Sequence, residues 1–147
     1  MVVTPMSVAV VTFYAGLNGL IALVLAALVV RQRGKTKTGI GTGGHPVLER
    51  AIRVHGNFIE YVPLILILLL LLELGGLAPL WVHLMGIALT LGRILHAWGL
   101  STDPGESFGR AAGTTLTWLT LLVAAALCII RGVLALAATG VPLLPIT

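Results

Sequence analysis

Residues 46–73 read PVLERAIRVHGNFIEYVPLILILLLLLE, a stretch with a polar first half and an apolar second half. After Tyr61 the sequence is an apolar run, as expected of a segment that crosses a bilayer. The half before Tyr61 carries charged and polar residues on what should be the same helix. Polar groups at membrane depth cost free energy unless they are paired or line a cavity, so this half suggests a functional site.

The spacing of the polar residues places four of them on one face of this helix. Arg53, Asn57, Glu60 and Tyr61 lie at positions i, i+4, i+7 and i+8. One interpretation is an Arg53–Glu60 ion pair across a helix–helix contact, which would hold the bundle together and is often neutral for stability. The other is a polar cleft for a small zwitterionic or anionic ligand, in which Arg53 meets a carboxylate and Glu60 accepts from an ammonium group.

The composition indicates an integral membrane protein of the all-α class. Of the 147 residues, 58% are apolar and only 10% are charged, whereas a soluble domain carries roughly 25% charged residues. The formal charge of +4 is not arranged as a basic patch with interleaved aromatics, so we expect no nucleic-acid partner. No Cys/His set has zinc-ligand spacing, and we expect no metal.

Four segments are long and apolar enough to span a membrane, and they predict a single domain, residues 1–147, that forms a four-helix bundle. The predicted helices cover about 7–30, 46–74, 79–100 and 110–139. Between them lie a basic, glycine-rich loop at 31–44, a short turn at 75–78 and a polar loop at 101–109. The first apolar stretch lacks the preceding basic region of a signal peptide, so we expect it to be retained as a helix.

Basic residues are concentrated in the first connection, and they predict the orientation. Arg31, Arg33, Lys35 and Lys37 lie there, whereas the turn at 75–78 contains no Lys or Arg. By the positive-inside rule, the connections at 31–44 and 101–109 are cytoplasmic and both termini lie on the opposite side. The polar half of the second helix then emerges on the same side as Arg110.

Two further sets of residues are candidates for this cleft. Arg93 and His96 are three residues apart on the third helix, and Arg93 either faces the cleft or extends to the lipid headgroups. Arg110 opens the fourth helix, where an arginine gains nothing from the helix macrodipole. Its position therefore favours ligand binding or an ion pair with Asp103 or Glu106.

The run ERAIRVHGNFIEYVPL at 49–64 resembles the signature of the membrane-associated proteins in eicosanoid and glutathione metabolism, the MAPEG superfamily, which includes the microsomal glutathione transferases. The matching positions are Glu49, Arg50, Arg53, Asn57, Glu60, Tyr61 and Pro63. Residues 39–63, together with GRILHAWGL at 92–100, are most similar to the bacterial inner-membrane branch of this family. The order of four helices matches over the whole chain.

The resemblance implies a homotrimer with three glutathione sites at subunit interfaces. Arg53, Asn57, Glu60 and Tyr61 would hold glutathione as the co-substrate, and His55 would contact its glycine carboxylate. Arg31 or Arg33 would add a basic contact from the next subunit. Arg110 lies near the position of the arginine that activates the glutathione thiol in relatives, after a loop that is about three residues longer than in leukotriene C4 synthase.

The sequence also departs from this pattern. Leukotriene C4 synthase has tyrosines on the third helix where this chain has His96 and Leu100. We therefore do not expect this chain to share the binding mode or the lipid substrate of that enzyme.

The leading hypothesis is a glutathione transferase or peroxidase that activates the thiolate against apolar small-molecule electrophiles arriving from the membrane lipids. A non-catalytic scaffold or lipid-binding protein of the same fold is an alternative. A small proton-coupled exporter is the third, although the first helix has no acidic residue.

Overall fold

The computed structural model describes residues 8–102, 105 and 107–139, and within these residues the secondary structure consists of four α-helices without strands. They are α1 (Ala9–Thr36), α2 (Pro46–Leu74), α3 (Pro79–Thr102) and α4 (Phe108–Ala138). All four are long and apolar enough to cross a membrane. The predicted all-α fold of four membrane-spanning helices is thus confirmed.

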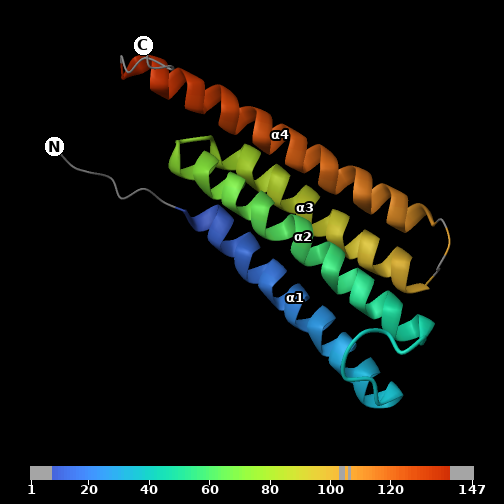
Figure 1. Ribbon diagram of the computed structural model, residues 1–147. Coiled ribbons are helices and arrows are strands. Elements are labelled where there is room, and N and C mark those ends of the chain that lie inside the picture. Colours follow the sequence, from blue (N-terminus) through green and yellow to red (C-terminus); the bar gives the residue numbers. More distant parts are fainter. Residues whose placement is uncertain (1–7, 103–104, 106, 140–147) are drawn as a thin grey trace, which may run out of the picture.

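The helices form an up-and-down bundle in which α2 and α3 lie at the centre (Figure 1). The central pair is flanked by α1, which packs on α2 and α3, and by α4, which packs on α3 and α2. Within the described residues α1 and α4 do not contact each other. The α1–α2 connection and the start of α4 lie at one end of the bundle, as the helix order predicts, and the α2–α3 turn lies at the other.

The main difference from the predicted boundaries is at the end of α1, which continues to Thr36 through part of the predicted loop 31–44. Arg, Gln and Lys are good helix formers, and basic residues near a helix C-terminus interact favourably with the macrodipole. Lys37 then ends the helix in the left-handed conformation. Arg33 donates to the carbonyls of Thr38, Gly39 and Gly41 at 3.0–3.2 Å, and this folds the connection back toward α2.

The other boundaries differ by one or two residues. α3 extends to Thr102 instead of residue 100, and α4 begins at Phe108 and ends at Ala138 instead of 110 and 139. The earlier start of α4 follows from its cap, because the Ser107 hydroxyl accepts the backbone N–H of Arg110 at 3.4 Å. Serine at this position satisfies one of the amides that a helix N-terminus leaves without an intrahelical partner.

Glu73 joins two helices at the far end of the bundle. Its carboxylate oxygens accept the backbone N–H groups of Val10 and Val11 at 3.0 and 2.8 Å, so the end of α2 caps the start of α1. A carboxylate suits this position because the N-terminal amides and the helix macrodipole both favour negative charge. This contact explains how a glutamate is accommodated next to a long apolar run.

Glycines allow α3 and α4 to approach each other closely near the end of α3 and the start of α4. A Cβ atom added at Gly113 of α4 would lie 2.5 Å from the Gly92 carbonyl oxygen and from the His96 amide nitrogen, both in α3. A Cβ at Gly99 would lie 2.4 Å from the Arg110 amide nitrogen. Small residues commonly mediate helix contacts in membranes, because shape complementarity drives association there. These contacts fix the start of α4 against the end of α3.

We predict that Gly113→Ala destabilises the protein, whereas Gly132→Ala on the same helix does not, because a Cβ at Gly132 has no atom within 4 Å. The expected loss for Gly113→Ala is about 1–3 kcal/mol, as for overpacked cores. Unfolding of the two variants in detergent micelles measures the difference. Equal stabilities would show that α3 and α4 are not in close contact at this point.

Candidate functional site

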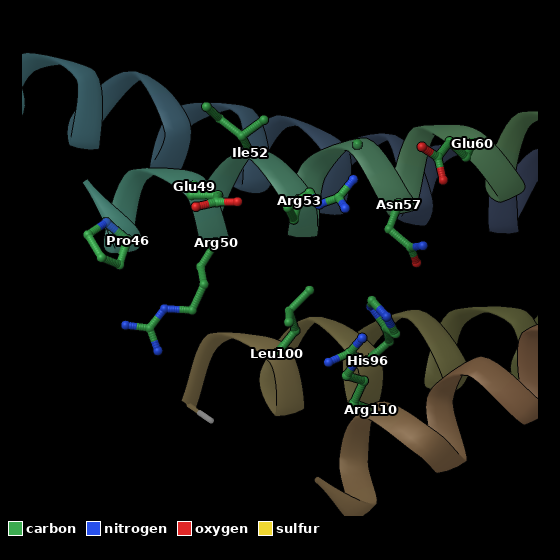
Figure 2. A pocket seen from close by; sticks show the side chains of 11 residues that line it. Pro46, Glu49, Arg50, Ile52, Arg53, Asn57, Glu60, His96, Leu100 and Arg110 are labelled. Atoms are coloured by element: carbon green, nitrogen blue, oxygen red, sulfur yellow. The ribbon is translucent and has the colours of Figure 1, made fainter. Parts of the chain in front are cut away.

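A pocket of about 700 Å³ opens between α2 on one side and the α3–α4 pair on the other. It lies at the end of the bundle where α2 begins, α3 ends and α4 begins (Figure 2). Its lining includes Arg53, Asn57 and Glu60 of the predicted polar face, together with His96 and Arg110. The lining residues are Pro46, Glu49, Arg50, Ile52, Arg53, Gly56, Asn57, Glu60, His96, Leu100 and Arg110.

The first wall of the pocket is one face of α2. Arg53, Asn57 and Glu60 line it, as their spacing predicts, and the same face continues toward the helix start through Glu49 and Arg50. Figure 2 shows Arg50 extending from α2 across the opening toward α3. Glu49 and Arg50 could have been found from the sequence, because they precede Arg53 by four and three residues and so share its face.

His96 and Arg110 form the opposite wall, on α3 and α4 respectively, and lie next to each other in Figure 2. The close approach of Gly99 to the start of α4 produces this arrangement. The Arg110 guanidinium donates to the Gly105 carbonyl at 3.4 Å. Asp103 and Glu106, the ion-pair partners considered from the sequence, lie outside the described residues.

Arg93 lies beneath the pocket and does not line it. Its side chain is 1% exposed. Its Nη2 donates to Asn57 Oδ1 at 2.7 Å, and its Nη1 donates to Thr117 Oγ1 at 3.4 Å. The side chain therefore does not extend to the headgroups, because α2 and α4 each offer it an oxygen acceptor within the bundle. It connects α2, α3 and α4 at one point.

The hydrogen bond from Arg93 determines which atoms of the Asn57 side-chain amide remain available to a ligand. A guanidinium only donates hydrogen bonds, so it selects the amide oxygen of Asn57 and leaves the amide N–H groups available to a ligand. Tyr61 also turns to Arg93, whose guanidinium carbon lies 5.9 Å from the centre of the Tyr61 ring. A cation over an aromatic face at this distance is attractive.

Besides Arg93, four of the residues expected to bind the ligand stay outside this lining. Tyr61 faces Arg93, and His55 is half-buried on α2. Arg31 is exposed near the end of α1, and Arg33 is committed to the carbonyls of the α1–α2 connection. Thr117 of α4, in contrast, belongs to the polar contacts beneath the pocket, because it accepts from Arg93 while donating to the Gly113 carbonyl at 2.7 Å.

The electrostatics of the pocket favour an anionic or zwitterionic ligand. Three arginines and two glutamates line it, and the charge of Arg93 lies directly below. Arg53 and Glu60 are exposed on α2 and form no ion pair within the described residues, so the Arg53–Glu60 ion pair considered from the sequence is not formed within the described part of the protomer. Both side chains remain free to contact a ligand or another subunit.

The fold and site together define a four-helix membrane protein with a charged pocket at one end. The MAPEG family model matches residues 11–130, and the chain belongs to this family. The chain is also 36% identical over 110 residues to the protein named "Inner membrane protein YecN" of Escherichia coli strain K12 and to its counterpart in strain CFT073 of serotype O6:H1. These matches cover 75% of this chain and 82% of each relative, and they confirm the family resemblance.

We predict a favourable coupling between Arg93 and Asn57 in a double-mutant cycle with Arg93→Met and Asn57→Ala. Coupling of about 1–3 kcal/mol is expected for a short, partly buried, charge-assisted hydrogen bond. Reversible unfolding of the four proteins in mixed micelles gives the value. The 3.4 Å contact between Arg93 and Thr117 provides a weaker reference pair. Additive effects of Arg93→Met and Asn57→Ala would disprove the energetic link.

Proposed function

We propose that this protein binds glutathione in the α2–α3–α4 pocket and acts as a glutathione transferase or peroxidase on apolar electrophiles. The observation that carries the proposal is that Arg53, Asn57 and Glu60 share one cavity with His96 and Arg110. Membership of the MAPEG family supports it. The resemblance of residues 49–64 to glutathione-binding relatives points to the same ligand.

The chemistry of glutathione suits the charges of this pocket. The tripeptide carries two carboxylates and one ammonium group, so it needs more cationic than anionic partners. Arg53 and Arg50 offer guanidinium groups for the carboxylates, and Glu60 offers an acceptor for the ammonium group. The free amide N–H groups of Asn57 can donate to a backbone carbonyl of the ligand.

Arg110 is the proposed activating residue. A free thiol with a pKa above 8 is mostly protonated at neutral pH. A guanidinium beside the sulfur favours the thiolate, by the same effect that lowers the pKa of reactive cysteines. The thiol proton leaves to water, and the sulfur lone pair then forms the new bond to the electrophile as its leaving group departs. Apolar electrophiles would reach the pocket from the bilayer.

A homotrimer is part of the proposal. The outward face of α2 carries exposed Arg53 and Glu60 and continues along the helix through exposed Leu64, Ile67 and Leu71. Lipid would leave the charged groups unsatisfied, whereas a second subunit could pair them. Such an interface would border the pocket and allow the exposed Arg31 of a neighbour to reach the ligand.

The proposed location is the bacterial inner membrane, with the pocket on the cytoplasmic side. The relatives in Escherichia coli are named as inner membrane proteins. The four basic residues between Arg31 and Lys37 lie at the same end of the chain's bundle as the pocket, and the positive-inside rule favours the cytoplasm for that end. Glutathione in the cytoplasm would then have direct access to the site.

We predict that Arg110→Ala lowers conjugation of a model electrophile by at least about 100-fold, the scale of losing one charge-stabilising donor. Glutathione binding should persist, because Arg53 and Asn57 hold the tripeptide. Arg53→Ala should lose binding itself. Isothermal titration and a conjugation assay separate the two effects, and Lys35→Ala, outside the pocket lining, serves as the control. Wild-type turnover in Arg110→Ala would refute its assigned role.

We predict that glutathione and its S-methyl analogue both raise the melting temperature of the purified protein, because a ligand that binds only the native state stabilises it. The analogue tests whether the pocket holds the tripeptide without a free thiol. A shift without any turnover of electrophiles would favour the non-catalytic scaffold. No shift with either compound at millimolar concentration would remove glutathione as the ligand.

A further inference from the structure

Three buried polar atoms of the bundle lack a hydrogen-bond partner among the described residues. They are Asn18 Oδ1, Arg93 Nε and His96 Nδ1. Their residues are 1%, 1% and 4% exposed, respectively. An unsatisfied polar group inside a membrane protein costs several kcal/mol, so native structures rarely leave such groups unpaired.

The residues that carry these atoms lie on the inward side of α3 or bond to it. Thr90, Arg93 and His96 are buried at three-residue steps, and Asn18 donates to Thr90 Oγ1 at 3.0 Å. The other side of α3 carries exposed apolar residues throughout its length. These are Trp81, Leu84, Ile87, Leu91, Ile94 and Trp98. The helix is thus amphipathic across the membrane, and its polar side is shielded from lipid by the other three helices.

The spacing along α3 suits bridging by water. A three-residue step corresponds to about 4.5 Å along the helix axis, which exceeds a direct hydrogen bond but lies within the reach of one bridging water. His96 lines the pocket, and Arg93 contacts Asn57, which also lines it. The series of buried polar residues thus begins at the pocket with His96 and ends inside the bundle at Asn18 and Thr90.

We propose that a short file of water molecules enters from the pocket at His96, passes Arg93 and ends at Asn18. Water fits the three atoms because it can donate to Asn18 Oδ1, accept from Arg93 Nε, and bond to His96 Nδ1 in either tautomer, and buried waters typically make about three such bonds. A cation does not fit beside the Arg93 guanidinium. An apolar occupant would leave all three atoms unsatisfied.

This hydrated path explains how the charge of Arg93 is tolerated. Its partners Asn57, Thr117 and the Tyr61 ring are neutral acceptors, and no carboxylate forms an ion pair with it in the described part of the chain. Internal water would solvate the guanidinium without an anionic ligand. Arg93 would then keep Asn57 correctly oriented even when no ligand is bound in the pocket, and it acts as a positioning residue for Asn57.

Hydroxyl-radical footprinting of the full chain in lipid nanodiscs tests the path, because radicals formed from internal water oxidise the side chains beside it. Cys128→Ser provides a background without the native thiol. In it, Thr90→Cys is compared with Leu89→Cys, which replaces an adjacent residue that is 0% exposed in the apolar core. We expect Thr90→Cys to oxidise about tenfold faster, as a thiol beside ordered water should.

A rate for Thr90→Cys within about threefold of Leu89→Cys would overturn the proposal, since both positions would then be equally dry, and any larger ratio supports it. Asn18→Cys against Leu25→Cys gives a second comparison on α1 should Thr90→Cys fail to fold. Gel filtration and circular dichroism verify the fold of each variant. The inference does not depend on glutathione, so its failure leaves the proposed function untouched.

Discussion

The hydrogen bond from Arg93 to Asn57 is the interaction on which the site depends. Arg93 is buried in α3, yet its guanidinium reaches α2 through Asn57 and α4 through Thr117. In a bilayer, polar groups must be satisfied within the protein, so such a group determines which helix faces can meet. The pocket lies directly above this point, and its polar wall on α2 is therefore fixed by a residue that does not line it.

A steric constraint acts together with this polar one. The carbonyl of Gly113 accepts from Thr117, and the missing side chain at Gly113 lets α4 approach the backbone of α3 at Gly92 and His96. The same close contact continues to Gly99 and the Arg110 amide. Arg110 can face His96 because the helices approach this closely. The glycines thus position the wall of the pocket formed by α3 and α4, and Arg93 positions the wall formed by α2.

Much of this arrangement could be predicted from the sequence. Apolar length predicted the four helices, and helical spacing placed Arg53, Asn57 and Glu60 on one wall of the pocket. The antiparallel order of the helices placed Arg110 at the same end. The partners of individual residues could not be predicted, because they depend on how helices rotate against each other. Glu73 caps α1 across 63 residues of sequence, and Arg93 bonds to Asn57 across 36.

The position of Arg110 near the start of α4 has a consequence for the chemistry of the pocket. A helix N-terminus carries partial positive charge, so an arginine there is placed unfavourably with respect to the macrodipole. An anion held beside Arg110 would experience both the guanidinium charge and the helix terminus. The position of Arg110 thus lowers helix stability slightly and concentrates positive potential at the wall of the pocket formed by α3 and α4. A thiolate is the kind of group that such a wall would stabilise, whereas a neutral thiol gains little from it.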